Sequence, residues 1–420
     1  MNSKSGIKIY SFLIWVYFFI GIVPYFFMMM PGNDAASVTL YLNSKLRFLD
    51  VFLVIFAVIA LYKNFVVKNR SVKKWSNPLL FLILFLLLVV AYSSISFGIN
   101  AFGEFRYTFI IIFLPLYITL TFEKNNVKKF LPIFIITYLL IAASLYIILS
   151  VYTGWGLLSF SASGDDRIFP SDISLGVLLS AIFLFLGKKY NKIKISSVIY
   201  RTLMIASIFM IILDNHRSVW LTALIILMAI VYLKEIKLSL IKAITILVPL
   251  FIFSIVLLNS LIISFIPKLN ERLLAFTDPE RDATASWRML QWTEQLQNFY
   301  NHPFLGEGLG GYWGLSDIKG DLGVMPHNMY VIILVKLGVI GLLIFLVVLV
   351  FYLRKFKVII NNNEGSSRFY ALVGIISTLV IFSYSIAYAL DFRTTWLFLG
   401  LSIAYFKNED IYVTKVRNIK

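Results

Sequence analysis

The chain has 420 residues, of which 60% are hydrophobic and 14% charged, and its formal net charge is +17 at pH 7. Soluble domains have roughly 45–50% apolar and about 25% charged residues, so this composition excludes a soluble globular protein and indicates an all-α polytopic membrane protein. The absence of Cys excludes disulfides, thiol nucleophiles and Cys-ligated metal sites.

Apolar segments long enough to cross a hydrocarbon core of roughly 30 Å recur along the whole chain. The first is too long for a signal peptide and lacks a small-residue cleavage site, so we expect it to remain as a transmembrane helix. The pattern predicts about 12 transmembrane helices, near residues 9–30, 47–62, 78–96, 107–122, 130–152, 172–187, 197–213, 219–233, 243–265, 329–353, 369–389 and 394–406.

Basic residues gather in alternate loops, where most of them are Lys. By the positive-inside rule these loops and both termini are cytoplasmic, which predicts a multi-pass membrane protein. The positive charge is therefore explained by topology and membrane lipids, and we expect no nucleic-acid partner. The Lys-rich loops lie within residues 63–74, 124–129, 188–201, 234–242 and 354–368.

Basic residues on the opposite, periplasmic side are mostly Arg. A planar guanidinium gives bidentate hydrogen bonds to phosphate or carboxylate, which an ammonium cannot do. Each one alone could instead pair with a nearby acid or reach the lipid headgroups. Taken as a set, they predict an anionic ligand on the outer side; they are Arg47, Arg106, Arg167, Arg217, Arg272, Arg281, Arg288 and Arg393.

One long periplasmic loop, residues 267–328, separates predicted membrane units over residues 1–266 and 329–420. Its aromatic content argues against disorder, and a connection of this length is usually functional. Helical spacing predicts a short helix that begins near Trp287 and stops at His302-Pro303. The glycine-rich run over residues 303–314 follows; with no preceding strand it is not a dinucleotide loop, and its glycines allow close backbone approach to a partner.

The loop ends with His327, directly before the next predicted helix. An imidazole at the mouth of a helical bundle is well placed for proton transfer near neutral pH, although a purely structural role is the alternative. The other two histidines, His216 and His302, lie in a short turn and at a helix end. No set of His, Asp and Glu has metal-ligand spacing, so we expect no metal site.

Four short motifs, in this order and topology, are together similar to those of the O-antigen ligase family, which includes polysaccharide polymerases and O-linked protein glycosyltransferases. The resemblance is strongest over about residues 195–345, and the first half of the chain matches only as a bundle of apolar helices. The motifs are Asn215-His216-Arg217-Ser218, Trp287-Arg288-x-x-Gln291-Trp292, the run from His302-Pro303 to Gly310, and Pro326-His327-Asn328.

This resemblance implies an inverting glycosyltransferase of the GT-C class, acting at the outer leaflet of the bacterial inner membrane. It implies that a glycan moves from undecaprenyl pyrophosphate to an acceptor hydroxyl, which for ligases is on a lipid A-core sugar. It implies no nucleotide sugar, no cofactor and no metal.

Such a reaction needs positive charge beside the departing pyrophosphate and a base beside the acceptor. We predict that Arg217 and Arg288 bind the pyrophosphate, with Arg47 and Arg106 as further candidates, and that His327 is the base. The residues predicted to orient the base or the acceptor, or to stack on sugar or polyprenyl, are Asn328, Glu307, Trp287 and Tyr330.

Three alternatives stay open, and one of them is a protein O-glycosyltransferase of the same family. Within the family, the chain could be a polymerase that joins repeat units, although the external Arg residues lack the Arg–Gly spacing of O-antigen polymerases. A transporter would place charges near the bilayer midplane in repeated halves. Lys336 is the main charge within a predicted span, and we expect it to face the bundle and bond to backbone carbonyls.

Overall fold

Helices dominate the computed structural model, in keeping with the all-α prediction. It describes residues 9–19, 41–43, 46–152, 169–213, 216–236, 283–311, 326, 328–386, 390 and 392–409. A short helix Ile9–Phe19 comes first. The elements after it are β1 (Tyr41–Asn43), β2 (Leu46–Arg47), α2 (Phe48–Val66), α3 (Arg70–Phe97), α4 (Ile99–Thr108), η2 (Ile110–Ile112), α5 (Phe113–Thr121), α6 (Lys124–Tyr152), α7 (Ser171–Lys189), α8 (Ser197–Leu213), α9 (Arg217–Tyr232), α12 (Ala283–Asn301), α13 (Met329–Asn362), α14 (Gly365–Tyr384) and α15 (Arg393–Phe406).

Five of the described helices, α3, α6, α7, α13 and α14, are long and apolar enough to cross a bilayer. The bent pair of α4 with η2 and α5 makes a sixth if it forms one broken span. Several described helices are shorter, and the span predicted over residues 243–265 lies outside the described residues. The structure therefore supports a polytopic membrane protein, and the number of about 12 spans stays a prediction.

The span predicted over residues 107–122 corresponds to η2 and α5, which together run from Ile110 to Thr121. Helix α4 ends at Thr108, and the chain turns by 55° before it continues through η2 into α5. Pro115 lies in the first turn of α5, where its missing N–H leaves no hydrogen bond unmade. The proline therefore marks the start of a second helix rather than the middle of a long one.

The core is closely packed where α15 meets α5 and α14. Gly400 brings α15 so close to α5 that an added Cβ would lie 2.8 Å from Pro115 Cα. On the other side, the rings of Tyr370 and Tyr405 stack with centroids 4.0 Å apart, and Ser402 Oγ donates to the Tyr370 carbonyl at 2.7 Å. Helices inside a membrane pack through small residues that allow their backbones to approach closely.

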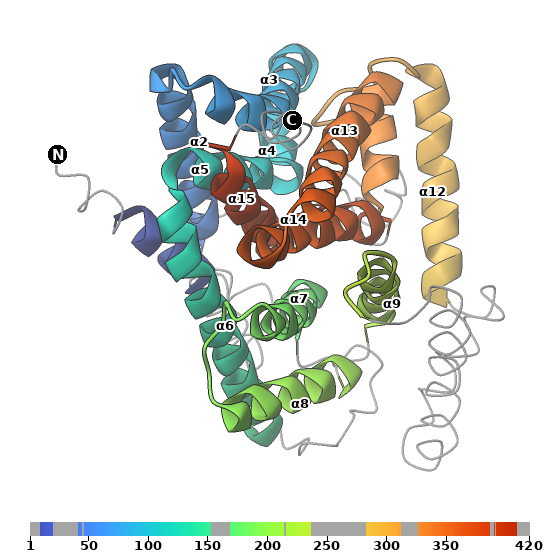
Figure 1. Cartoon of the computed structure of the whole chain (residues 1–420). Coiled ribbons are helices and arrows are strands. Elements are labelled where there is room, and N and C mark those ends of the chain that lie inside the picture. Colours follow the sequence, from blue (N-terminus) through green and yellow to red (C-terminus); the bar gives the residue numbers. More distant parts are fainter. Residues whose placement is uncertain are drawn as a thin grey trace.

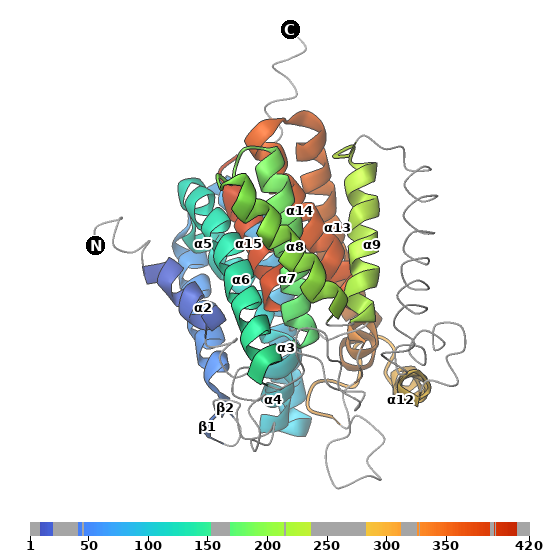
Figure 2. The ribbon, with the colours of Figure 1, turned by 90° about the horizontal axis from the view of Figure 1, so that it is seen from below.

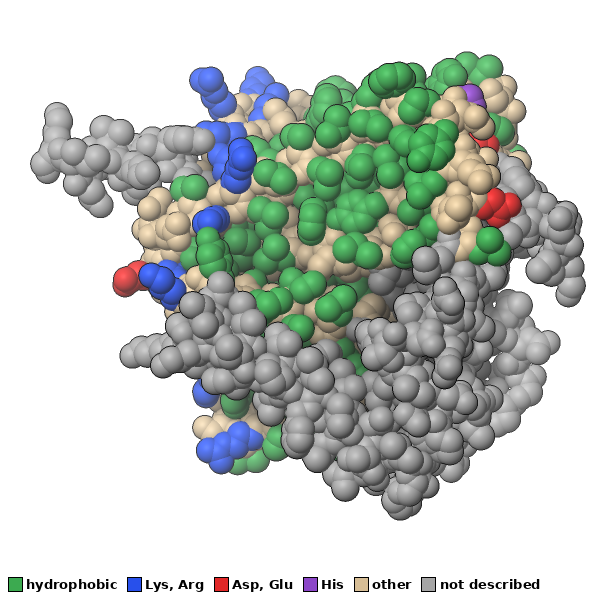
Figure 3. Space-filling model, turned by 90° about the vertical axis from the view of Figure 1, so that its right-hand side faces the viewer, with side chains coloured by type: hydrophobic (Ala, Val, Ile, Leu, Met, Phe, Trp, Pro, Cys, Tyr) green, Lys and Arg blue, Asp and Glu red, His purple; other side chains and the backbone are tan. Residues whose placement is uncertain are grey.

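Charge is distributed unevenly along the bundle. In the space-filling view, a broad apolar surface separates an edge rich in Lys and Arg from the opposite edge, where acidic side chains and a histidine appear (Figure 3). Figure 2 shows β1, β2, α4 and α12 together at one end of the bundle. We call the other end, where α7 and α9 finish and α14 begins, the Lys-rich end.

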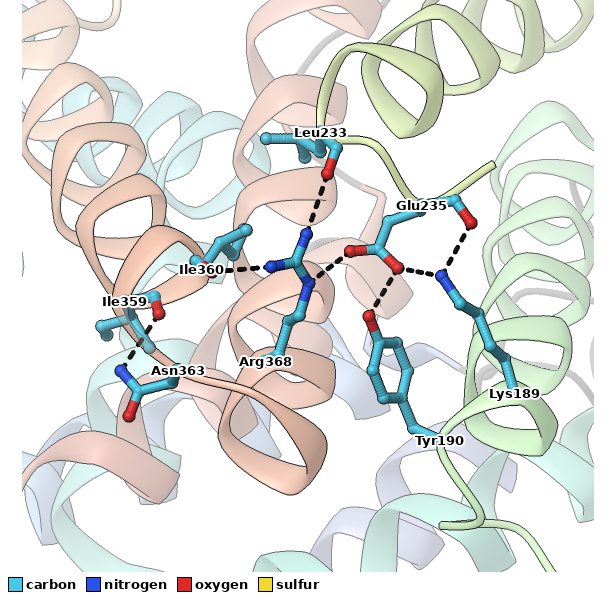
Figure 4. Close-up of polar contacts among 8 residues, drawn as sticks. All are labelled: Lys189, Tyr190, Leu233, Glu235, Ile359, Ile360, Asn363 and Arg368. Atoms are coloured by element: carbon cyan, nitrogen blue, oxygen red, sulfur yellow. Dashed lines mark hydrogen bonds and ion pairs between the residues drawn. The ribbon is translucent and has the colours of Figure 1, made fainter. Parts of the chain in front are cut away.

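A polar cluster ties four elements together at the Lys-rich end (Figure 4). The Glu235 carboxylate accepts hydrogen bonds from Lys189, from Tyr190 at 2.5 Å and from Arg368 Nε at 2.6 Å. Arg368 also donates to the carbonyl of Leu233 at 2.9 Å. Burial opposes ionisation of Glu235, but these donors outweigh it and hold its pKa below the usual value. Burial, reinforced by this carboxylate, raises the pKa of Tyr190 to about 12.

Glu235→Gln should lower the free energy of unfolding by about 2 kcal/mol, because two cations lose a buried charged partner. A group whose pKa is depressed by folding contributes fully above its unfolded pKa and loses that contribution as the pH falls through the folded value. The difference between the two proteins, measured by unfolding in mixed micelles, should therefore be full at pH 7 and shrink below pH about 4. An equal difference at both pH values would contradict an ionised Glu235.

Candidate active site

Helix α12 crosses the end of the bundle instead of running along it. Figure 1 shows its full length, and in Figure 2 it is seen end-on beside the upright bundle helices. Its end at Asn301, before His302-Pro303, confirms the predicted stop. Gln291 and Gln295 are fully buried on its inner face, whereas Leu290 and Tyr300 are exposed. Gln291, the glutamine of the Trp-Arg-x-x-Gln-Trp motif, is thus buried against the protein.

Residues 303–311, here called the glycine loop, fill a break in α13. At Gly338 the backbone leaves the helical conformation (φ 65°, ψ −171°), which the sequence analysis did not anticipate. Two amides and two carbonyls of α13 are freed there, and the loop supplies the complementary groups, as buried irregular backbone in a membrane protein requires. The four hydrogen bonds run from Val339 N to Pro303 O (2.9 Å), Ile340 N to Phe304 O (3.2 Å), Glu307 N to Val335 O (2.8 Å) and Gly308 N to Lys336 O (3.2 Å).

Glycine is required on both sides of this junction. Gly306 and Gly338 both have positive φ. A Cβ on Gly306 would lie 2.4 Å from the backbone of Lys336, and one on Gly338 would lie 2.2 Å from the carbonyl oxygen of Phe304. Because the obstructing atoms are backbone, they cannot move aside. The close backbone approach that the glycines predicted is confirmed, and its partner is α13.

Buried charges fasten the same loop from the side. The Lys336 side chain is fully buried, and its Nζ donates to Gly311 O at 3.0 Å and lies 3.5 Å from Glu307 Oε2 and 3.8 Å from Glu104 Oε2. Glu104, on α4, also accepts the amide hydrogen of Gly310. The expectation that Lys336 bonds to backbone carbonyls is confirmed. Sequence reasoning missed its two carboxylate partners, although a charge within an apolar helix signals that a partner exists.

Asn328 begins α13 as its N-cap. Its Oδ1 accepts the amide hydrogens of Tyr330 at 3.0 Å and Val331 at 3.3 Å. The Met329 amide donates to Ser385 O at 2.8 Å, which anchors this end of α13 to α14. The chain on the C-terminal side of His327 is therefore held at a defined place, while His327 itself lies outside the described residues.

Two further predicted site residues have side chains in protein contacts. Arg106 forms an ion pair with the buried Asp50 at 3.3 Å and lies over the ring of Tyr107. The hydroxyl of Tyr330 donates to Phe382 O at 2.6 Å. The ion pair of Arg106 matches the alternative of pairing with a nearby acid, and substrate binding by either residue stays a prediction.

The other predicted site residues have described backbones only. Arg217 is the first residue of α9, Arg47 ends β2, and Trp287 and Arg288 belong to α12. Their side chains lie outside the described part of the structure, so their binding roles stay predictions. In the described ranges, no group of three or more His, Asp and Glu residues comes together as a set of metal ligands.

Asp172 is a charged residue that sequence reasoning did not single out. It lies in the first turn of α7, and its carboxylate interacts electrostatically with Arg393, at the start of α15, and with His216, which precedes α9. His216 is buried, and its Nε2 lies 2.9 Å from Phe169 O. The N-terminal ends of three helices therefore meet around charged groups; an acidic residue in a first helical turn was the available signal.

Comparison with known proteins agrees with this geometry. Residues 202–346 match the family model of the O-antigen ligase domain, a range that contains α9, α12, the glycine loop and the break in α13. The chain is also 25% identical over 417 residues to a ComP-specific O-oligosaccharyltransferase from Acinetobacter baylyi (strain ATCC 33305 / BD413 / ADP1), a match that covers 93% of this chain and 71% of that protein. Both matches support the O-antigen ligase family, to which this chain is similar over its C-terminal half in particular.

Proposed function

We propose that this protein transfers a glycan from undecaprenyl pyrophosphate to an acceptor hydroxyl at the periplasmic face of the bacterial inner membrane. The reaction inverts the anomeric centre and uses no metal or other cofactor. The preferred acceptor is a sugar of lipid A-core. The observation that carries the proposal is the match of the O-antigen ligase domain to the segment that contains α12, the glycine loop and the break in α13.

The charge distribution supports the proposed orientation. The cluster around Glu235 and the basic end of α13 lie at the Lys-rich end, which the positive-inside rule assigns to the cytoplasm. The opposite end, with α12 and the start of α13, then faces the periplasm. A site there has no access to cytosolic nucleotide sugars, which fits a donor that is already activated as a lipid pyrophosphate.

The glycine loop supports a shared site for α12 and α13. Helix α12 carries Arg288 and leads directly into the loop, and the loop is bonded to α13, whose N-cap follows His327. A rigid junction of this kind holds groups from two helices at a fixed separation, which catalysis of a group transfer requires.

The chemistry needs one proton transfer and one substitution. The acceptor hydroxyl gives its proton to His327 while its oxygen forms a bond to the anomeric carbon. The bond from that carbon to the pyrophosphate oxygen breaks, and its electron pair leaves with undecaprenyl pyrophosphate. Arg217 and Arg288 stabilise the negative charge that grows on this leaving group. A single in-line displacement inverts the anomeric configuration.

A protein hydroxyl is the second candidate acceptor. The observation that favours it is the name of the Acinetobacter relative, an O-oligosaccharyltransferase specific for ComP. A Ser or Thr hydroxyl and a sugar hydroxyl make the same demand on the base, so the two acceptors differ in the surface that presents the hydroxyl and not in the reaction.

Reconstitution with separated acceptors tests the proposal. The purified chain in vesicles receives undecaprenyl-pyrophosphate glycan together with lipid A-core, with the protein ComP, or with no other acceptor. Glycan on lipid A-core supports the ligase, and glycan on protein supports the second candidate. Longer glycans on undecaprenyl pyrophosphate would identify a polymerase. Movement of the donor across the bilayer without any transfer would identify a transporter and refute the proposal.

Arg217→Lys and Arg288→Lys should each lower kcat by about 10²-fold, because the ammonium keeps the charge but loses the bidentate contact to pyrophosphate. Initial rates with the lipid-linked donor measure the effect, and Arg201→Lys, at the predicted cytoplasmic end of α8, is the matched control. Wild-type rates in both site variants would show that bidentate contact to pyrophosphate is not needed.

A further inference from the structure

Two apolar side chains project from the turn that joins α12 to the glycine loop. Phe304 is 72% exposed and Leu305 is 56% exposed. The backbone beneath them is fixed, because Phe304 O accepts the Ile340 amide hydrogen at 3.2 Å and Pro303 O accepts that of Val339 at 2.9 Å. We call these two side chains, Phe304 and Leu305, the apolar point. The fixed backbone holds them outward, directly beside the place where α13 resumes after its break.

This point continues an exposed apolar stripe on α13. The exposed side chains Val339, Leu343 and Val347 are four residues apart, and the exposed Ile340 lies three residues before Leu343, so all four share one face of the helix. Helix α13 is a candidate membrane span, and a face of this kind in a span contacts lipid. Phe304 and Leu305 lie beside the end of that face at the break, where Phe304 O accepts the Ile340 amide hydrogen.

The length of α13 shows why apolar side chains beside the break are useful. After the break, the uncharged apolar segment runs from Val339 to Leu353, and Arg354 and Lys355 follow. At 1.5 Å per residue this segment spans about 22 Å, which is short of a hydrocarbon core of roughly 30 Å. Basic side chains can reach outward from the core at the Lys-rich end. At the other end, the exposed apolar side chains of Phe304 and Leu305 lie directly beside the start of this segment.

We propose that Phe304 and Leu305 insert into the outer leaflet of the membrane and anchor α12 at the level of the lipid headgroups. The occupant of this surface is the bilayer itself, because the surface is continuous with the lipid-facing side of α13. Resting on the proposed function, the anchor would hold the helix that carries Arg288 at the depth where the pyrophosphate of a lipid-linked donor lies.

Site-directed spin labelling measures this depth directly. The chain contains no Cys, so each introduced Cys is a unique label site in the full-length protein. Phe304→Cys and Leu305→Cys are labelled and reconstituted in phosphatidylethanolamine and phosphatidylglycerol vesicles. Leu343→Cys, in the stripe on α13, is the lipid reference, and Glu364→Cys, exposed between α13 and α14, is the water reference. Because all four positions are exposed, the substitutions should leave the thermal stability of the protein unchanged.

The ratio of oxygen to nickel-chelate accessibility gives the outcome. We expect the ratio at positions 304 and 305 to exceed that of the water reference severalfold and to approach that of the lipid reference. A ratio equal to the water reference would overturn the anchor. Low accessibility to both reagents would also overturn it, since another protein surface or a second copy would then cover the point. No glycan transfer is measured, so failure of the proposed reaction would leave this result standing, and the reverse also holds.

Discussion

Replacing His327 by Ala should lower the rate of glycan transfer by about 10³-fold, because the acceptor hydroxyl loses the base that removes its proton. The KM for the lipid-linked donor should change little, since in the proposed mechanism guanidinium groups, and not the imidazole, bind the pyrophosphate. Single-turnover assays with reconstituted protein separate the two quantities. Folding and membrane insertion should match those of the wild type.

His302→Ala is the matched control for this prediction. His302 is exposed at the end of α12, and the structure uses its backbone carbonyl, which accepts the Gly306 amide hydrogen at 2.9 Å. Loss of this second imidazole should therefore leave transfer near the wild-type rate. Transfer by His327→Ala at the rate of His302→Ala would remove His327 from the mechanism.

The second large effect is on stability: Lys336→Met should lower the free energy of unfolding by about 3–5 kcal/mol, the cost of removing one member of a buried ion cluster. Without the ammonium, Glu104 and Glu307 are left as neighbouring carboxylates with no cation between them, and Gly311 O loses its donor. The glycine loop should detach from α13 and glycan transfer should fall with it. Unfolding by SDS in mixed micelles measures the stability change.

Two variants make this prediction specific. Lys357→Met changes an exposed lysine of the same helix, which contacts Tyr232, and should cost less than about 0.5 kcal/mol. The double variant Lys336→Met with Glu104→Gln should regain part of the lost stability, because the buried carboxylate is removed together with its cation. Equal stability of the two lysine variants would show that the cluster does not hold the loop.

The break in α13 explains why charge and glycine occur together in this region. A helix that stops being helical inside a membrane protein must have its free amides and carbonyls satisfied by other backbone. Only a loop backbone without obstructing side chains can approach α13 this closely. This explains why Gly306 lies opposite Gly338. The ion cluster around Lys336 then fixes the loop laterally. In this structure, the motif over residues 302–310 joins α12 to the break in α13.

Much of this protein could be read from local sequence. Hydrophobic length predicted the long apolar helices that the structure describes, the His302-Pro303 stop predicted the end of α12, and Lys336 inside an apolar segment predicted a bond to a backbone carbonyl. These features depend on the conformational preferences of neighbouring residues and on the cost of burying charge. Both can be judged from the local sequence.

Tertiary structure alone decided which groups meet. The glycine loop bonds to α13 at the break around Gly338. Arg106 pairs with Asp50, and Glu307, a predicted site residue, pairs with Lys336. Glu104 and Gly310 are separated by some two hundred residues in the chain, and their contact follows from how the helices pack. Local periodicity carries no record of such a pairing, because any buried carboxylate needs a donor and the sequence does not say which one will be near.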